Sequence, residues 1–153
     1  MIPTRAIVLG ATGAVGSALV RELLAAPDWL EVTALVRRPT AQFDACARRE
    51  KLLVHVTPMD RVEAVAAGMG RGCTIAFSTL GVGQPRKVSR EELWNVDVGH
   101  TAMFAQGCRS AGVLHFSLLG AVGADPRSRS YYLKIKGKAE EAVAVQHFKR
   151  ASF

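Results

Sequence analysis

The sequence predicts one α/β domain in which parallel strands alternate with helices to form a doubly wound sheet. Three observations predict it: apolar segments of strand length recur along the chain, stretches with helical spacing separate them, and a glycine-rich turn joins the first of each kind. The 153 residues are 49% hydrophobic and 22% charged, which suits a single domain with a sizeable core. We expect this domain to cover residues 1–153 without a linker or an internal repeat.

The first predicted unit is a strand, a turn and a helix. Residues 6–9 form an unbroken apolar run, as expected of a central strand covered on both faces. Gly10, Gly13 and Gly16 follow with G-x-x-G-x-x-G spacing, and a helix opens at about Ala14. A Cβ at Gly13 or Gly16 would occupy space that a phosphate or a packed strand needs, and the helix start presents unpaired N–H groups. We interpret the turn as a dinucleotide pyrophosphate site, although an ordinary strand-to-helix turn also fits the spacing.

The remaining elements follow the same alternation. We expect further strands at 31–36, 52–56, 74–80 and 113–119. Ser89 and Glu92 make a capping box for a helix that runs to about Ala111, with Gly112 after it, and a last helix spans about 131–147. The chain ends at 151–153, where the alternation calls for a sixth strand, so we expect C-terminal strands and the substrate segment to be missing.

Composition excludes several classes of function. The net charge is +7, but the basic residues lie in scattered pairs without aromatic interleaving, so we expect solvated surface and an anionic cofactor rather than nucleic acid. No segment is long and apolar enough to span a membrane and no leader precedes the first strand, so we expect a cytoplasmic protein. Cys46, Cys73 and Cys108 are odd in number and far apart, which predicts reduced, mostly buried thiols and no metal site.

The end of the second predicted strand indicates which cofactor the chain prefers. Arg37 and Arg38 follow this strand, and no acidic residue lies where one would accept a hydrogen bond from the adenosine ribose. A guanidinium suits a 2′-phosphate, so we favour NADP, with an exposed basic turn as the simpler alternative. Asp60, just past the third strand, either accepts from the adenine amino group or caps the next helix.

A second motif opens the last predicted helix. Tyr132 and Lys136 form a Y-x-x-x-K step, and residues four apart share one face of a helix. A neighbouring cation favours phenolate, which suits a phenol that exchanges a proton with a carbonyl oxygen as hydride is transferred. A solvated amphipathic helix would explain the same two residues.

Together the two motifs resemble the short-chain dehydrogenase/reductase superfamily, in its extended and atypical branches. The segments 77–81, 95–97, 115–119 and 123–125, followed by 132–137 and Glu140, are similar to the Tat-interacting oxidoreductase-like branch. This resemblance covers nearly the whole chain and implies a Rossmann fold that binds NADPH.

The resemblance also implies residue roles. It places the pyrophosphate along the glycine turn, the 2′-phosphate at the arginine pair, the ribose and pyrophosphate beside the segment after the fourth strand, and the nicotinamide ribose and substrate at the Y-x-x-x-K step. Asn95 matches a residue whose backbone helps to hold a proton-relay water in many relatives, although an ordinary helix-surface residue is the alternative. The residues concerned are Gly10, Thr12, Gly13, Ala14, Val15, Gly16, Arg37, Arg38, Leu80, Gly81, Asn95, Tyr132 and Lys136.

One departure from the family pattern leaves two hypotheses open. Relatives carry a serine at the end of the fifth strand that donates a hydrogen bond to the substrate carbonyl, but Gly120 and Ala121 stand here. The first hypothesis is an NADPH-dependent oxidoreductase of a small carbonyl or alcohol substrate. The second is an NADPH-binding regulatory or scaffold protein with weak or no turnover. Either hypothesis allows a homodimer or a regulatory protein partner.

Overall fold

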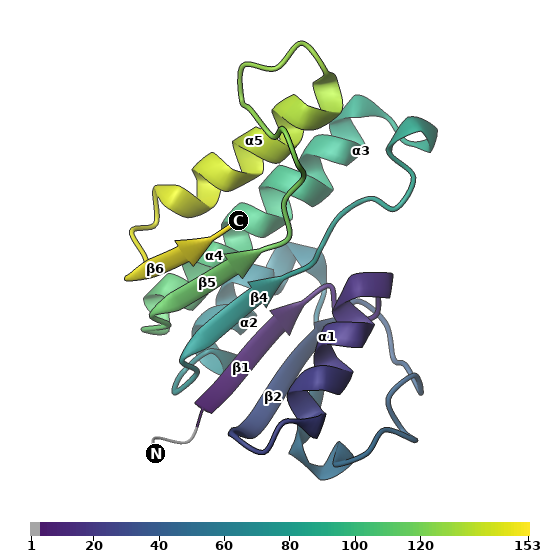
Figure 1. Cartoon of the computed structure of the whole chain (residues 1–153), viewed down its shortest axis with the longest axis vertical. Helices are drawn as coiled ribbons and strands as arrows, with labels where there is room; N and C mark the ends of the chain where they lie inside the picture. Colours follow the sequence, from purple (N-terminus) through teal and green to yellow (C-terminus); the bar gives the residue numbers. More distant parts are fainter. Residues whose placement is uncertain (1–3) are drawn as a thin grey trace.

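The computed structural model describes residues 4–153, which form a six-stranded sheet of order β3-β2-β1-β4-β5-β6 (Figure 1). Every neighbouring pair of strands is parallel. The predicted doubly wound α/β class is therefore confirmed. The strands are β1 (Thr4–Leu9), β2 (Trp29–Val36), β3 (Leu52–Val56), β4 (Ile75–Ser78), β5 (His115–Leu118) and β6 (Arg150–Ser152).

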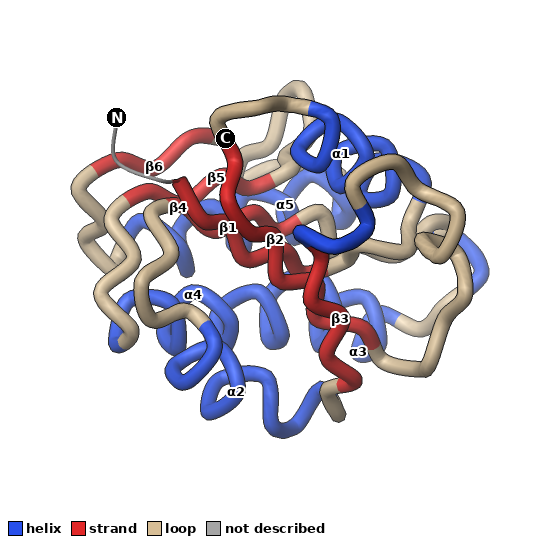
Figure 2. Tube along the Cα trace, turned by 90° about the horizontal axis from the view of Figure 1, so that it is seen from below, coloured by secondary structure: helices blue, strands red, loops and turns tan. Residues whose placement is uncertain are grey.

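Helices cover both faces of the sheet, as the two views together show (Figures 1 and 2). One face is covered by α1 (Ala14–Ala25) and by the loop that contains Phe43. The other is covered by four helices that pack into a single apolar cluster. These are α2 (Val62–Met69), α3 (Arg90–Trp94), α4 (Thr101–Ser110) and α5 (Tyr131–Ala144), with the π-helical turn η4 (Asn95–His100) between α3 and α4.

Alternation along the central strands divides the core in two. Ile7 and Leu9 of β1 belong to the cluster under α2, α4 and α5, whereas Ala6 and Val8 face α1. All four are buried to 1% exposure or less, because a central parallel strand is covered on both faces. The apolar run at 6–9 is therefore what places β1 at the centre of the sheet.

The strand order changes direction at β1, and this positions the site. From β1 the chain moves outward through β2 and β3, then crosses back so that β4 lies on the other side of β1. In such sheets the loops that leave neighbouring strands on either side of the reversal open a crevice at their carboxyl ends. The loops after β1, β2 and β4 meet at that crevice.

The structure adjusts several predicted boundaries. The predicted strands at 74–80 and 113–119 shorten to β4 and β5, and the last helix ends at Ala144 rather than at 147. The Glu92 amide donates to the Ser89 hydroxyl over 3.0 Å, as the capping box predicts. The expectation that the chain stops before a sixth strand is wrong, because β6 pairs with β5.

The three cysteines are free thiols and mostly buried, as the sequence predicts. Cys73 and Cys108 are buried and Cys46 is half-buried, and all three are free. Burial raises the pKa of Cys73 to about 11, and it raises the pKa of Cys108 well above its usual range. Both buried thiols are therefore protonated at neutral pH. No helix in residues 4–153 is long and apolar enough to cross a membrane.

Candidate functional site

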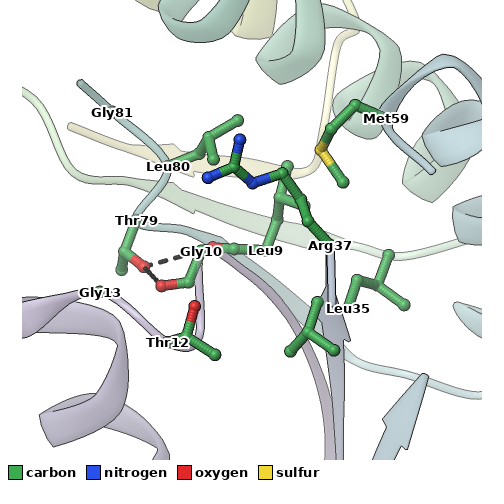
Figure 3. A pocket seen from close by; sticks show the side chains of 11 residues that line it. Leu9, Gly10, Thr12, Gly13, Leu35, Arg37, Met59, Thr79, Leu80 and Gly81 are labelled. Carbon is green, nitrogen blue, oxygen red and sulfur yellow. Dashed lines mark hydrogen bonds between the residues drawn. The ribbon is translucent and has the colours of Figure 1, made fainter. Parts of the chain in front are cut away.

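The turn after β1 is held against the end of β4. Gly10 has a φ of +82°, and a Cβ there would lie 2.6 Å from the Leu80 amide nitrogen and 2.7 Å from the Thr79 carbonyl carbon. The Thr79 amide donates to the Leu9 carbonyl over 2.9 Å, and its hydroxyl donates to the Gly10 carbonyl over 3.0 Å (Figure 3). Glycine at position 10 thus allows both the left-handed backbone and the close approach of β4.

The other two glycines of the motif have different neighbours. A Cβ at Gly16 would collide with the Gly10 carbonyl oxygen and the Thr79 hydroxyl, so this glycine brings α1 close to the turn. A Cβ at Gly13 would meet only the Gly10 carbonyl oxygen, at the ordinary contact distance of 3.5 Å. The protein itself does not require glycine at 13, and the space beside it is available to a ligand.

The first turn of α1 faces the same space with unsatisfied donors. Gly13 is the N-cap, no side chain caps the helix, and its first turn holds no acidic residue. The first N–H groups of a helix have no acceptor within it, and they carry the positive end of its dipole. Thr12, Ala14 and Val15 are exposed around this helix start, while Gly16 is buried beneath it. An anion is the ligand that these groups favour.

These elements enclose a cavity of about 150 Å³ at the carboxyl ends of β1, β2 and β4 (Figure 3). Six of the residues expected to hold a cofactor line it: Gly10, Thr12, Gly13, Arg37, Leu80 and Gly81. Leu9, Leu35, Val36, Met59 and Thr79 complete the lining. The cavity therefore combines an apolar floor with backbone donors and one guanidinium.

Of the residues expected near the adenosine end of the cofactor, only some line the cavity. Arg37 lines the cavity and its side chain extends toward Leu80 (Figure 3), whereas Arg38 is exposed outside the lining. Asp60 is exposed within the short helix η2 (Met59–Arg61), and no side chain caps η2 or α2, so the capping alternative fails.

Burial and the charge of Arg37 lower the pKa of His100, which favours the neutral imidazole.

The Y-x-x-x-K pair lies on one face at the start of α5, as its spacing predicts. Ser130 caps this helix by accepting from the Leu133 amide over 3.4 Å. The Lys136 Nζ lies 5.5 Å from the centre of the Tyr132 ring. The Tyr132 side chain reaches solvent, with 37% exposure, whereas Lys136 is 9% exposed. The phenol is thus accessible to a substrate while the ammonium is buried behind it.

Asp97 explains how the structure accommodates this buried ammonium. Its carboxylate forms a hydrogen-bonded ion pair with Lys136, and its other oxygen accepts from the Val82 amide over 3.2 Å. A Cβ at Gly81 would lie 3.2 Å from the Lys136 Nζ and 3.5 Å from an Asp97 carboxylate oxygen. Asp97, which is 2% exposed, therefore joins η4, α5 and the loop after β4. Sequence reasoning did not assign it a role.

Asn95 and Gly120 lie outside this cluster. The exposed side chain of Asn95 lines a separate hollow with residues of α3 and α4, apart from Tyr132 and from the glycine turn. A Cβ at Gly120 would lie 2.9 Å from a carboxylate oxygen of Glu140, the end of a flexible side chain. Burial raises the pKa of that carboxyl. The structure thus brings together the glycine turn, Arg37, Gly81 and the Tyr132–Lys136 pair. The Asn95 side chain lines a separate hollow, and the role expected of its backbone stays a prediction.

Comparison with known proteins agrees with this geometry. The model of a family described as NAD(P)H-binding matches residues 10–149 of the chain. The chain belongs to this NAD(P)H-binding family. The matched region begins at the glycine turn and includes Arg37, Asp97 and α5. The residues that surround the cavity are therefore part of an NAD(P)H-binding domain.

Similar proteins place the chain near the branch that its motifs resemble. Protein HTATIP2 of Rattus norvegicus is 30% identical over 146 residues, which are 95% of this chain and 58% of that protein. Protein FMP52, mitochondrial, of Eremothecium gossypii is 30% identical over 145 residues, which are 95% of this chain and 62% of that protein. The resemblance to the atypical short-chain dehydrogenase/reductases is confirmed. The chain spans about three fifths of the length of these relatives.

Solved structures share the fold at low sequence identity. MoeE5 in complex with UDP-glucuronic acid and NAD has a TM-score of 0.78 at 20% identity, and the match covers 97% of this chain and 52% of that one. The Citrobacter sp. triphenylmethane reductase complexed with NADP(H) has a TM-score of 0.70 at 20% identity, with coverage of 95% and 47%. This chain thus corresponds in fold to about half of each larger protein.

The different surroundings of Gly13 and Gly16 give a matched pair of variants. We expect Gly13→Ala to leave the free energy of unfolding within about 0.5 kcal/mol of wild type, while the NAD(P)H dissociation constant rises about tenfold. Gly16→Ala should instead destabilise the fold by about 1–3 kcal/mol, because its Cβ has no space. Urea denaturation and nicotinamide fluorescence measure the two effects. Unchanged cofactor affinity in Gly13→Ala would place the pyrophosphate elsewhere.

The Asp97–Lys136 pair predicts a second stability effect. Asp97→Ala leaves a buried ammonium without its partner, which should cost about 3–5 kcal/mol in the free energy of unfolding. Adding Lys136→Met to that variant removes the unpaired charge and should recover much of the loss. Chemical denaturation of the wild type, the single variant and the double variant tests this. A single variant as stable as wild type would contradict the assignment.

Proposed function

We propose that the chain is an NADPH-dependent oxidoreductase of the short-chain dehydrogenase/reductase type that acts on a small carbonyl or alcohol substrate. One observation carries the proposal. Gly81 lines the cofactor cavity and also lies beside the Lys136 ammonium, which is placed over the ring of Tyr132. A proton donor therefore stands directly beyond the end of the cavity.

The residues at the cavity fit a dinucleotide. The open space beside Gly13 and the uncapped start of α1 suit the pyrophosphate, since a side chain there would exclude it. Arg37 suits the 2′-phosphate of NADPH. Among the described residues that line the cavity, none carries a carboxylate that would select the ribose hydroxyl of NADH. Arg38 is close enough in sequence to support Arg37, and Asp60 stands next to the cavity-lining Met59.

The proposed chemistry divides between cofactor and protein. When bound, NADPH supplies a hydride for the substrate carbonyl carbon. The Tyr132 phenol donates its proton to the carbonyl oxygen, and solvent restores that proton afterwards, since the side chain is exposed. Lys136 is held by Asp97 beside both the phenol and Gly81, so its position does not depend on substrate. In the alcohol direction the same phenol, as phenolate, accepts the proton.

Gly120 favours a second candidate function, an NADPH-binding regulatory or scaffold protein. No hydroxyl stands at Gly120 or Ala121 to donate to a substrate oxygen, and the loss of one such donor can slow a reaction about a hundredfold or more. In this case the cofactor would order the loops around the cavity without turnover. Both candidates require the dinucleotide, and only the first requires the Tyr132 proton.

The role of Tyr132 is tested by removing one oxygen atom. Tyr132→Phe keeps the ring over Lys136 but has no proton to donate, so turnover should fall at least about a hundredfold. NADPH affinity should stay within about twofold, because the phenol lies beyond the cavity. Absorbance of NADPH against a panel of small aldehydes and ketones, with a parallel binding titration, provides both readouts. Equal turnover in wild type and variant would exclude this mechanism, and binding without turnover in wild type would favour the second candidate.

Cofactor preference is tested at the arginine pair. Replacing Arg37 and Arg38 with Ala removes the cations proposed for the 2′-phosphate, so the NADPH dissociation constant should rise about tenfold or more. The NADH dissociation constant should change much less, since NADH has no 2′-phosphate. Calorimetric titration of wild type and variant with both cofactors measures the ratio. Parallel losses for the two cofactors would show that the pair does not recognise the 2′-phosphate.

A further inference from the structure

A second hollow adjoins the site on the other side of Tyr132. It has a volume of about 580 Å³, in the range of small-molecule sites, and it combines an apolar surface with polar groups. Tyr132 and Ser130 line it from the start of α5, and the loop after β4 lines it from the opposite side with Gln84, Pro85, Arg86 and Lys87. We refer to these six residues as the Tyr132 groove.

Successive parts of the loop after β4 line the cofactor cavity and the Tyr132 groove. Leu80 and Gly81 line the cavity, and the same loop continues to 84–87, which line the groove. Asp97 fixes the loop between these two parts by accepting from the Val82 amide. Tyr132 lines the groove, and its ring lies 5.5 Å from the Lys136 Nζ, which is beside Gly81. A substrate in the groove would meet the proton donor and the end of the cavity together.

The charges of the Tyr132 groove have one sign. Arg86 and Lys87 are exposed, and within residues 4–153 neither forms an ion pair with a carboxylate. No lining residue among those described is acidic. The Ser130 hydroxyl accepts from the Leu133 amide and retains its own proton to donate, and Gln84 adds amide donors. Two unpaired cations and two further donors around one hollow attract an anion.

The α5 side of the groove is held in place before any ligand binds. The Tyr131 hydroxyl donates to the Arg90 carbonyl over 3.1 Å, and the Arg90 guanidinium lies 4.6 Å from the centre of the Tyr131 ring. These contacts join the start of α3 to the start of α5, on which Ser130 and Tyr132 stand. Pro85 and the Tyr132 ring provide apolar surface for the body of a small molecule.

We propose that the Tyr132 groove is the substrate site and that it selects carbonyl compounds that carry a carboxylate, which Arg86 and Lys87 bind while the carbonyl faces Tyr132. This inference rests on the proposed function for its chemistry but not for its binding. The reaction balances with NADPH as the reductant: the carbonyl carbon gains hydride, the oxygen gains the Tyr132 proton, and the carboxylate is unchanged. Positive charge remote from the reacting atoms thus determines which substrates the site accepts.

The test uses two probes of one skeleton that differ in charge, 4-carboxybenzaldehyde and its methyl ester. We expect wild type to show a kcat/KM about tenfold higher for the carboxylate, since two surface cations together contribute on that order. In the double variant Arg86→Gln, Lys87→Gln this preference should fall to about one. The control Arg21→Gln, Arg71→Gln removes the same charge from exposed positions outside the groove and should keep the preference.

A binding measurement separates this inference from the proposed activity. The unreactive acid 4-(hydroxymethyl)benzoate and its methyl ester are titrated into the protein with NADPH by saturation-transfer NMR. Tighter binding of the acid that is lost in Arg86→Gln, Lys87→Gln supports the groove, even if neither aldehyde is reduced and the oxidoreductase proposal fails. Equal binding of acid and ester, or equal loss of acid binding in the control variant, would overturn the inference even if both aldehydes are reduced.

Discussion

The close approach of the Gly10 turn to Thr79 is the constraint on which the rest of the site depends. The Thr79 amide and hydroxyl bond to the Leu9 and Gly10 carbonyls, and Gly16 brings α1 against the same atoms. This contact joins β1 to β4 where the strand order reverses, so the two halves of the sheet meet at the cavity. The Leu9 and Gly10 carbonyls are thus occupied by Thr79, and the Gly10 carbonyl also accepts from the Gly13 amide, so the N–H groups of the first turn of α1 remain available to a ligand.

The buried Asp97–Lys136 pair extends this arrangement toward the reacting groups. Ion pairs of this kind contribute little net stability against a well-packed apolar alternative, but the loss of one partner is costly. Asp97 uses both carboxylate oxygens, one for Lys136 and one for the Val82 amide, so the loop after β4 and the start of α5 keep a fixed relation. This relation aligns Gly81 in the cavity with Tyr132 in the groove.

The order and type of the elements could be predicted because local patterns determine them. The run at 6–9 must be buried on both faces, the Ser89 cap begins α3, and Gly112 with its positive φ follows the end of α4, as the residues indicate. The single helix expected between these two signals is instead divided into α3, η4 and α4. The role of Asp97 could not be predicted, since it depends on a partner 39 residues away that only the folded chain brings close. The same applies to Thr79, whose hydroxyl bonds to a carbonyl 69 residues earlier in the chain.

The central claim is that the uncapped start of α1 binds the pyrophosphate of a nicotinamide dinucleotide. Titration of the 15N-labelled chain with NADPH, followed by amide NMR spectra, tests this most directly. We expect the amides of Ala14, Val15 and Gly16 to shift together and saturate at one cofactor per chain, since these first N–H groups of α1 have no acceptor within the helix and would gain one. Saturable binding that leaves these three amides unshifted, or no binding at all, would contradict it.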